Sequence, residues 1–357
     1  MSVATKRPGT RRTREPGTPP RPLVVLASIV LATGTGAAIW LLPSRAHGEW
    51  AVVGQAGPSA TPSGPAPGAT PGPAATPSPT PAVARPSGFV TFVDAARGPR
   101  FNLSREVRKG HVRWFTLGHL TAGQKGCVPR WGGLRARDGG PLADRFAPLR
   151  AAGGNAGIAF GGPQGRELAA ACSDLARLTA AYRRVIGAFG ATHIDFEVRD
   201  PADAAVVLRR ARAIAALQRE ATREGRSLTV SFTLPVTRAG LSPGDQEMLR
   251  ATRSAGAEIA AVNLLALVGT APGAESRLRT ITSAVRAAHP QIARSLGESA
   301  AWHRIALTPV LARSGDLTRL DAHRLAAFSS RNHLAWLSAR GAALSPAITR
   351  FLIGATR

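Results

Sequence analysis

Short apolar runs alternate with longer amphipathic runs from residue 88 to the end of the chain. The apolar runs predict eight strands, at residues 88–95, 111–120, 155–162, 191–198, 227–235, 259–267, 303–311 and 332–338. Apolar side chains that recur every three or four residues predict helices between them, at residues 166–189, 202–222, 243–256, 274–288 and 318–330. Apolar strands separated by helices are typical of a parallel sheet covered on both faces, so the pattern predicts an α/β domain.

Two α/β architectures compete for this pattern. Eight strand–helix units within residues 88–357 fit a (β/α)8 TIM barrel, whose functional groups gather at the carboxyl ends of the strands. A doubly wound open sheet is the alternative, but no predicted strand runs into the G-x-G-x-x-G turn that binds a dinucleotide in that fold. We therefore predict a TIM barrel over residues 88–357 and no cofactor.

An uncharged stretch, residues 23–42, precedes this domain. Its length matches a bilayer core of about 30 Å, so it predicts a transmembrane helix. Residues 1–22 are strongly basic, which predicts a cytoplasmic tail, a single-pass signal anchor in the cell membrane and an extracellular carboxyl-terminal domain. A cleaved signal peptide is the alternative, with Ser44-Arg45-Ala46 as a weak processing site, and it would make the domain a secreted one.

Residues 43–87 are rich in Pro, Ala, Thr, Ser and Gly. Such a composition cannot bury enough apolar surface to offset the entropy lost on ordering, so we predict a disordered linker. Its prolines favour a semi-extended spacer that holds the following domain away from the membrane surface.

The chain carries a formal net charge of +25, most of it within residues 88–357. A strongly basic domain attracts anionic partners such as acidic wall polymers, lipid head groups or nucleic acid. Nucleic acid is the least favoured of these, because the domain has no dense run of arginines interleaved with aromatic residues. GC-rich coding is the competing explanation for the many arginines.

Cys127 and Cys172 are the only cysteines in the chain. Outside the cytoplasm such a pair favours a disulfide. The two residues lie far apart in sequence, so two free thiols are the alternative. Two thiols and scattered histidines lack the spacing of metal ligands, and we predict no metal site.

The run T-H-I-D-F-E-V-R-D at residues 192–200 carries the candidate chemistry. Alternation along a strand places Asp195, Glu197 and Arg199 on one face. Paired carboxylates at the end of a barrel strand are typical of acid/base catalysis, but an arginine in third place is not. We expect His193 to lie on the opposite face and to pack against a helix.

An ordered series of motifs resembles the bacterial chitinase-type domain of glycoside hydrolase family 18. The motifs are FVTFVDA, FTLGHLTAGQKGCVPRWGG, AFGG, ELAAACSDL, THIDFEV, TLPVTRAGLS, VNLLAL and LAWLSARG, in register over about residues 88–341. The resemblance implies a TIM barrel that acts on polymers of N-acetylglucosamine. Each motif alone is weak, whereas the complete series in order is specific.

This family is marked by D-x-x-D-x-D-x-E on the fourth strand, in which the last Glu protonates the glycosidic oxygen and the Asp before it orients the substrate's acetamido group. The corresponding positions here are Thr192, Asp195, Glu197 and Arg199. An arginine therefore stands in place of the acid, and arginine keeps its proton at any working pH. Glu197 lies about 6.6 Å deeper along the strand, beyond the ~3.2 Å reach of a general acid. We expect Arg199 to pair with Glu197 or Asp200.

The resemblance also implies further losses. The M-D-Y-G-like end of the sixth strand is matched by residues 267–270, LVGT, and the Asn-Asp after the seventh by Leu311 and Ala312. Trp336 stands where the family places the tryptophan floor under the sugar, although it would equally pack the barrel mouth. Asp94 ends the first strand, either as a polar group at the mouth or as a turn residue. The candidate substrate-binding residues are Asp94, Asp195, Glu197 and Trp336.

These departures favour a membrane-anchored, chitinase-like domain without hydrolytic activity that binds N-acetylglucosamine-containing glycans, chitin-like or peptidoglycan, or the cell envelope. One alternative is an active chitinase or endo-N-acetylglucosaminidase that works through Asp195 and Glu197. Another is an envelope scaffold that binds only protein. The sequence carries no signature of an oligomeric state.

Overall fold

The computed structural model describes most of the domain predicted from residue 88 onward. The described residues are 85–97, 101–109, 112–132, 140–201, 203–268, 274–298 and 302–356. The predicted cytoplasmic tail, the transmembrane anchor and nearly all of the predicted linker lie outside them. Within the described residues, no helix is both long and apolar enough to cross a membrane. All of them belong to one unit, Pro77–Arg357.

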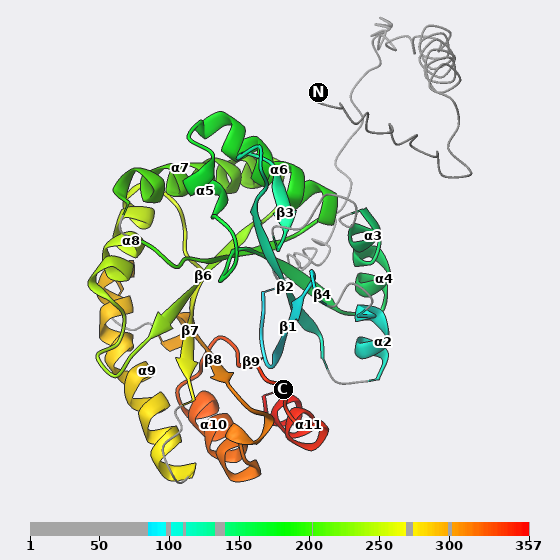
Figure 1. Cartoon of the computed structure of the whole chain (residues 1–357), viewed down its shortest axis with the longest axis vertical. Coiled ribbons are helices and arrows are strands. Elements are labelled where there is room, and N and C mark those ends of the chain that lie inside the picture. Colours follow the sequence, from blue (N-terminus) through cyan, green and yellow to red (C-terminus); the bar gives the residue numbers. More distant parts are fainter. Residues whose placement is uncertain are drawn as a thin grey trace, which may run out of the picture. The chain divides into compact units, whose positions relative to one another are not determined.

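The parallel strands predicted from the apolar runs form a single sheet that curls into a barrel (Figure 1). In sheet order the strands are β1 (Val90–Asp94), β2 (Trp114–Ala122), β4 (Asn155–Gly161), β5 (His193–Glu197), β6 (Thr229–Val236), β7 (Ala261–Leu267), β8 (Ile305–Leu311) and β9 (Arg340–Gly341). A short strand, β3 (Pro129–Trp131), pairs antiparallel with β2 outside this order. Seven of the eight predicted apolar runs coincide with strands β1, β2 and β4 to β8.

The eighth predicted run nearly closes the barrel without forming a regular strand. Leu337 makes parallel bridges to Phe89 on one side and to Leu307 on the other. Its amide donates to the carbonyl of Gly88 at 2.9 Å, and its carbonyl accepts from the amide of Val90 at 2.8 Å. The regular pairing with β8 begins only further along, in β9. The architecture is that of a (β/α)8 barrel, as predicted, with an irregular eighth strand.

Helices surround the barrel between successive strands (Figure 1). They are α2 (Leu103–Arg108), α3 (Gly140–Ala143), α4 (Phe146–Ala151), α5 (Leu168–Ala171), α6 (Leu175–Phe189), α7 (Ala204–Arg223), α8 (Pro243–Ser254), α9 (Ala274–Leu296), α10 (Arg319–Arg331) and α11 (Pro346–Ala355). The single helix predicted at residues 166–189 is in fact two. Asp174 caps the amino end of α6, where its carboxylate accepts from the amide of Arg177 at 2.7 Å.

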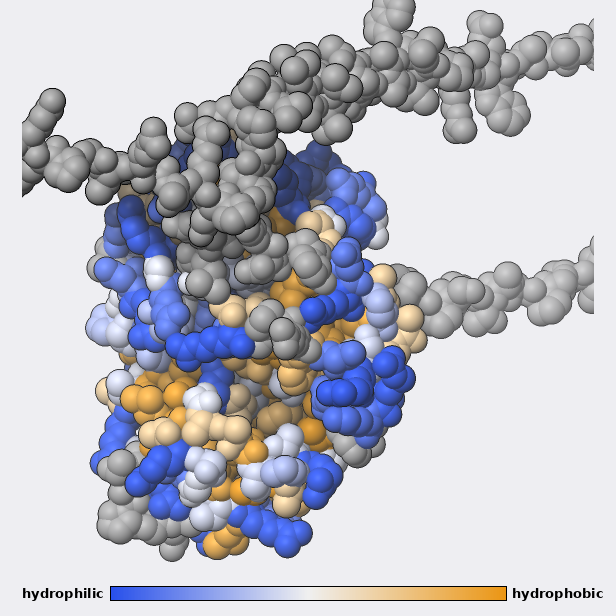
Figure 2. All heavy atoms as spheres, turned by 45° about the vertical axis from the view of Figure 1, so that its right-hand side comes forward, coloured by the Kyte–Doolittle hydropathy of each residue, from blue (hydrophilic) through white to orange (hydrophobic). Residues whose placement is uncertain are grey.

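The main core lies between the outer face of the barrel and the helices. Phe160, Phe196 and Phe232 stack along β4, β5 and β6, with successive ring centroids 5.5 and 5.6 Å apart. Tyr182 of α6 packs edge-on against the first two rings, as the predicted apolar stripe of this helix requires. On the face drawn in Figure 2, hydrophilic side chains surround a central area where hydrophobic side chains reach the surface.

A second, smaller core fills the barrel where its strands begin. It consists of Val90, Trp114, Ala261, Ala306 and Trp336. This layer blocks the amino-terminal end of the lumen, so any ligand must approach from the carboxyl ends of the strands. That end is the mouth, where TIM barrels carry their functional groups.

Candidate functional site

Three polar side chains meet inside the barrel just below the mouth. Glu197 ends β5, and its Oε2 accepts a hydrogen bond from Nε2 of His119 at 2.7 Å. Arg340 of β9 donates from Nη1 to the same oxygen and forms an ion pair with it. The side chain of Glu197 is only 3% exposed, so the carboxylate is withdrawn from water between two partners. Breaking such a buried pair leaves an uncompensated charge, which makes the arrangement rigid.

The environment of Glu197 decides its protonation state. Burial by itself would raise its pKa, but the hydrogen bond from His119 and the charge of Arg340 outweigh burial and lower the pKa from 4.5 to about 2. Because an ionised carboxylate only accepts hydrogen bonds, Nε2 of His119 must carry a proton. Glu197 is therefore an anion near neutral pH and has no proton to give to a substrate.

His119 and Arg340 are functional residues that the sequence analysis missed. Strict alternation along β2 would point His119 outward, but the pairing of β2 with β4 shifts between Leu117 and Leu120. A bulge of this kind re-aims a side chain, and here it turns His119 toward the mouth. Arg340 follows Trp336 by four residues, so the inward alternation of the eighth run reaches Arg340 once that run is extended past residue 338.

Phe92 of β1 lies between these groups. The guanidinium carbon of Arg340 lies 3.9 Å from the centroid of the Phe92 ring, and the ring of His119 lies 5.0 Å from it. Two glycines make this packing possible. A Cβ on Gly118 would lie 2.6 Å from the Phe92 ring, and a Cβ on Gly162, where φ is +89°, would lie 2.4 Å from the His119 ring.

Asp195 lies one layer deeper on β5 and is only 3% exposed. Ser231 donates to its Oδ1 at 2.5 Å, and Thr233 donates to its Oδ2 at 2.8 Å. Burial raises the pKa of Asp195 to about 6, against the lowering effects of the Ser231 hydroxyl, the charge of Arg340 and the Thr233 hydroxyl. Asp195 and Glu197 therefore share the inner face, as predicted, but both are buried.

The prediction that His193 packs against a helix was wrong. His193 and Asp195 are two residues apart on one strand, so they point the same way, into the lumen. The ring of His193 lies edge-on to Trp114 and Trp336, with centroids 6.4 and 6.0 Å away, and Nε2 lies 3.1 Å from the hydroxyl of Ser231. Burial lowers the pKa of His193 to about 3, so its ring is neutral near neutral pH.

Arg199 lies beyond the end of β5 and is exposed at the mouth. The predicted pairing of Arg199 with Glu197 was wrong, because Glu197 takes His119 and Arg340 as its partners. Among the residues that the structure describes, no carboxylate forms an ion pair with Arg199. Its charge is therefore free to meet a ligand.

The other two candidate substrate-binding residues lie at opposite ends of the lumen. Trp336 is 6% exposed and belongs to the small core that fills the amino-terminal end, so it lies at the floor of the lumen and not at the mouth. Asp94 ends β1 at the mouth, where its Oδ1 accepts from the amides of Ala96 and Arg97 at 3.1 Å each. Asp94 thus lines the mouth and closes a turn at the same time.

Two cavities meet at Arg340 and Phe92, which line both of them. The outer cavity, of about 820 Å³, opens at the mouth and continues toward α2 and α11. Its polar lining at the mouth includes Asp94, Arg97, His119, Gln164, Arg199 and Arg340. The inner cavity, between Arg340 and Trp336, measures only about 10 Å³. A cavity of this size has room for about one water molecule, so it cannot hold a sugar ring.

Apolar side chains stand at the ends of β7 and β8, which the resemblance matches to polar positions of family 18. Leu267 ends β7 and is 74% exposed, and Val268 after it is buried. Residues 269 and 270 lie outside the described part of the chain. Leu311 is buried at the end of β8. Across the described ranges, no three His, Cys, Asp or Glu side chains gather in a way that could hold a metal ion.

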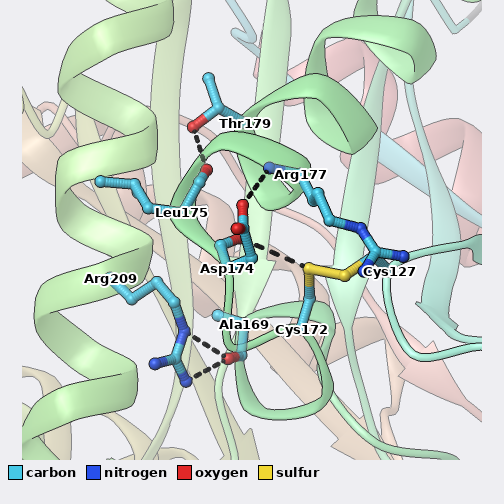
Figure 3. Close-up of a disulfide and its surroundings, with 8 residues drawn as sticks. All are labelled: Cys127, Ala169, Cys172, Asp174, Leu175, Arg177, Thr179 and Arg209. Carbon is cyan, nitrogen blue, oxygen red and sulfur yellow. Dashed lines mark hydrogen bonds between the residues drawn. A yellow bond between two sulfur atoms is a disulfide. The ribbon is translucent and has the colours of Figure 1, made fainter.

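The predicted disulfide between Cys127 and Cys172 is present, with the two Cα atoms 4.7 Å apart. It joins the loop between β2 and β3 to the segment between α5 and α6 (Figure 3). Arg209 of α7 fastens α5, just before this segment, since it donates from Nε and Nη2 to the carbonyl of Ala169 at 3.1 and 2.7 Å. Two loops on the mouth side of the barrel are thereby fixed in place.

The fold can now be compared with solved structures. The catalytic domain of a hyperthermophilic chitinase from Pyrococcus furiosus superposes with a TM-score of 0.64 at 22% identity, over 76% of this chain and 95% of that one. A GH18 chitinase from Cycas revoluta in complex with (GlcNAc)3 gives a TM-score of 0.55 at 12% identity, over 75% of this chain and 98% of that one. The barrel has the family 18 chitinase fold.

Sequence comparison agrees with this chitinase-like barrel over part of the chain. The chain is 26% identical over 182 residues to a probable bifunctional chitinase/lysozyme of Escherichia coli, and 26% identical over 166 residues to endochitinase 11 of Metarhizium anisopliae. The matched segments cover 50% and 46% of this chain but only 20% and 31% of those two proteins. No protein-family model matches the chain.

Proposed function

We propose that this protein is a non-catalytic, chitinase-like domain that binds glycans containing N-acetylhexosamine at the outside of the cell membrane. The observation that carries the proposal is the contact of Glu197 with both His119 and Arg340. This contact holds Glu197 in its ionised form. It also places the Arg340 side chain across the lumen, above Asp195.

Hydrolysis of a glycosidic bond needs a proton donor at the mouth. Glu197, with a pKa of about 2, is ionised near neutral pH. Asp195, with a pKa of about 6, holds a proton more readily, but it lies beneath Arg340 beside a cavity of only about 10 Å³. Arg199 keeps its proton at any working pH. Neither carboxylate of β5 therefore combines a transferable proton with access to a substrate.

Glycan binding is supported by what the mouth retains. The mouth opens into the outer cavity, whose volume of about 820 Å³ also includes space between the barrel and the helices α2 and α11. It combines the aromatic ring of Phe92 with polar groups from Asp94 and Gln164. One solved chitinase of the same fold is bound to (GlcNAc)3, and mutants of another are complexed with chito-oligosaccharides. The anchor at residues 23–42 and the spacer at 43–87 would hold this mouth at the cell envelope.

Two measurements on the purified full chain test this function. The first is release of a fluorophore from chitobiose and chitotriose conjugates between about pH 4 and 9, the range over which a general acid would titrate. We expect no release by the natural chain or by Arg199→Glu, because Arg340 still fills the lumen. The second is calorimetric titration with chitotetraose and with peptidoglycan fragments, in which we expect heat of binding.

Either of two results would overturn the proposal. Release that disappears in Glu197→Gln would make the chain an active chitinase or endo-N-acetylglucosaminidase. Absence of heat with every glycan, together with salt-sensitive capture of envelope proteins that sugars do not compete for, would make it a protein-binding scaffold. Protease treatment of intact cells tests the location, since an outward-facing domain is cut without lysis.

A further inference from the structure

Three arginines and three carboxylates, Asp94, Glu106 and Glu197, line the outer cavity, but they do not all pair with one another. The three arginines are Arg97, Arg199 and Arg340. Arg97 lies 3.6 Å from the carboxylate of Asp94, and Arg340 is paired with Glu197. Within the described part of the chain, Arg199 is thus the one arginine of this lining without a carboxylate partner.

We propose that the glycan bound at this mouth is acidic, an N-acetylhexosamine polymer whose sugars bear carboxylate groups, and that Arg199 binds the carboxylate. This inference rests on the glycan-binding function proposed above. It adds the charge of the ligand and names the residue that selects for it. The resemblance places Arg199 at the position of the catalytic Glu, so the mouth has exchanged a negative group for a positive one.

The chemistry of arginine suits this role. Its planar guanidinium presents paired N–H donors that match the two oxygens of a carboxylate, which a neutral sugar hydroxyl cannot offer. Water solvates an unpaired arginine at the mouth as well as at any other exposed position, so the location alone adds no stability. The carboxylate of a ligand would add a charge-assisted hydrogen bond. The net charge of +25 on the chain also favours approach of an anionic polymer.

The filled lumen determines where the sugar lies. Arg340 and Phe92 close the path to the inner cavity, so a pyranose ring cannot descend to Trp336. A ring held above this partition lies at the level of the strand ends, where Arg199 and Gln164 are exposed. Other substituents of the ring, besides its acetamido group, then lie within reach of the side chains at the mouth.

The test compares an acidic glycan with two neutral ones, of which the reduced form is the match for charge. The full chain, kept in a non-ionic detergent, is titrated with a tetrasaccharide of alternating N-acetylglucosamine and N-acetylmuramic acid, with the same tetrasaccharide after reduction of its carboxylates to alcohols, and with chitotetraose. We expect the acidic tetrasaccharide to bind about tenfold more tightly than either neutral one, the factor of one charge-assisted contact. At about 0.5 M salt the advantage should shrink, because exposed charges are screened.

Matched variants assign the effect to Arg199. Arg199→Gln should lose the tenfold preference, so that the acidic tetrasaccharide binds no more tightly than its reduced form. Arg184→Gln removes an equally exposed arginine on α6, away from the mouth, and should keep the preference. If Arg199→Gln keeps it as well, general charge attraction explains the preference and the assignment of Arg199 falls.

The outcomes separate this inference from the function on which it rests. Equal affinity for acidic and neutral tetrasaccharides would overturn the inference and leave glycan binding intact. No binding of any glycan would remove the proposed function itself. A glycerol-phosphate oligomer serves as a further ligand, since it carries anionic groups without amino sugars. If it displaces the acidic tetrasaccharide and Arg199→Gln abolishes its binding, the ligand is a phosphate polymer and the carboxylate assignment is wrong.

Discussion

Replacing Arg340 by methionine should destabilise the barrel in a way that depends on pH. Methionine keeps most of the length and apolar surface of the side chain but removes the charge. Glu197 then loses one of its two partners while it stays 3% exposed. The carboxylate would have to remain ionised with His119 alone, or take up a proton.

The pKa of Glu197 sets the magnitude. Lowering a pKa from 4.5 to about 2 corresponds to about 3 kcal/mol in favour of the ionised form in the folded state. Removing one partner of a buried pair costs about 3–5 kcal/mol in proteins generally. We therefore expect Arg340→Met to lower the free energy of unfolding by about 3 kcal/mol at pH 7.

The pH dependence follows from the direction of the shift. Because folding lowers the pKa of Glu197, its stabilising contribution is fully present above about pH 4.5 and is lost as the pH falls through about 2. In Arg340→Met the pKa should rise, since burial is then opposed only by His119. The gap in stability between the natural chain and the variant should consequently narrow as the pH falls from the raised pKa of Glu197 in the variant toward about 2.

Urea unfolding followed by far-ultraviolet circular dichroism, at several pH values, measures this gap. Arg199→Met is the matched control, because it removes an exposed arginine and should change stability by less than about 0.5 kcal/mol. The double variant Arg340→Met with Glu197→Gln should recover much of the loss, which gives the coupling of the pair. A loss below about 0.5 kcal/mol at pH 7, or a gap that does not change with pH, would refute the argument.

Three further predictions concern stability and protonation. Joint replacement of Cys127 and Cys172 by serine should reduce the free energy of unfolding by up to about 4 kcal/mol, from the loop of 45 residues that the disulfide closes, and urea unfolding with and without reductant checks it. The ring of His193 should stay neutral from neutral pH down to about pH 4, because burial lowers its pKa to about 3. Nuclear magnetic resonance spectra recorded over this pH range check it. A ring that titrates near pH 6.5 would contradict the buried placement of His193. Glu167→Gln should lower the free energy of unfolding by about 3–5 kcal/mol, because it removes the carboxylate partner of the fully buried Arg210. Glu220→Gln, at the exposed pair with Arg183, should lower it by less than about 1 kcal/mol. Equal losses would show that burial does not decide the difference.

Local periodicity predicted the strands and helices because each depends on its own short stretch of chain. The apolar runs placed seven strands within a few residues, and the stripe on residues 166–189 correctly turned Tyr182 toward the core. The break in that helix depends on a cap, Asp174, which a periodicity argument does not weigh. Alternation along β5 puts His193 on the same face as Asp195, two residues away, so the sequence alone was enough to place it inside the barrel. The prediction of the opposite face did not follow this alternation.

The sequence by itself supplied the resemblance to family 18, which assigns Arg199 to the position of the catalytic acid, since residue type and motif spacing need no coordinates. Only the tertiary structure decided the partners and the protonation state of Glu197. Its partners come from β2 and β9, 78 and 143 residues away in sequence, and one of them is aimed by a bulge that leaves no periodic signal. Protonation depends on burial and on charges brought together by barrel closure, so the state of Glu197 is a property of the fold and not of its motif.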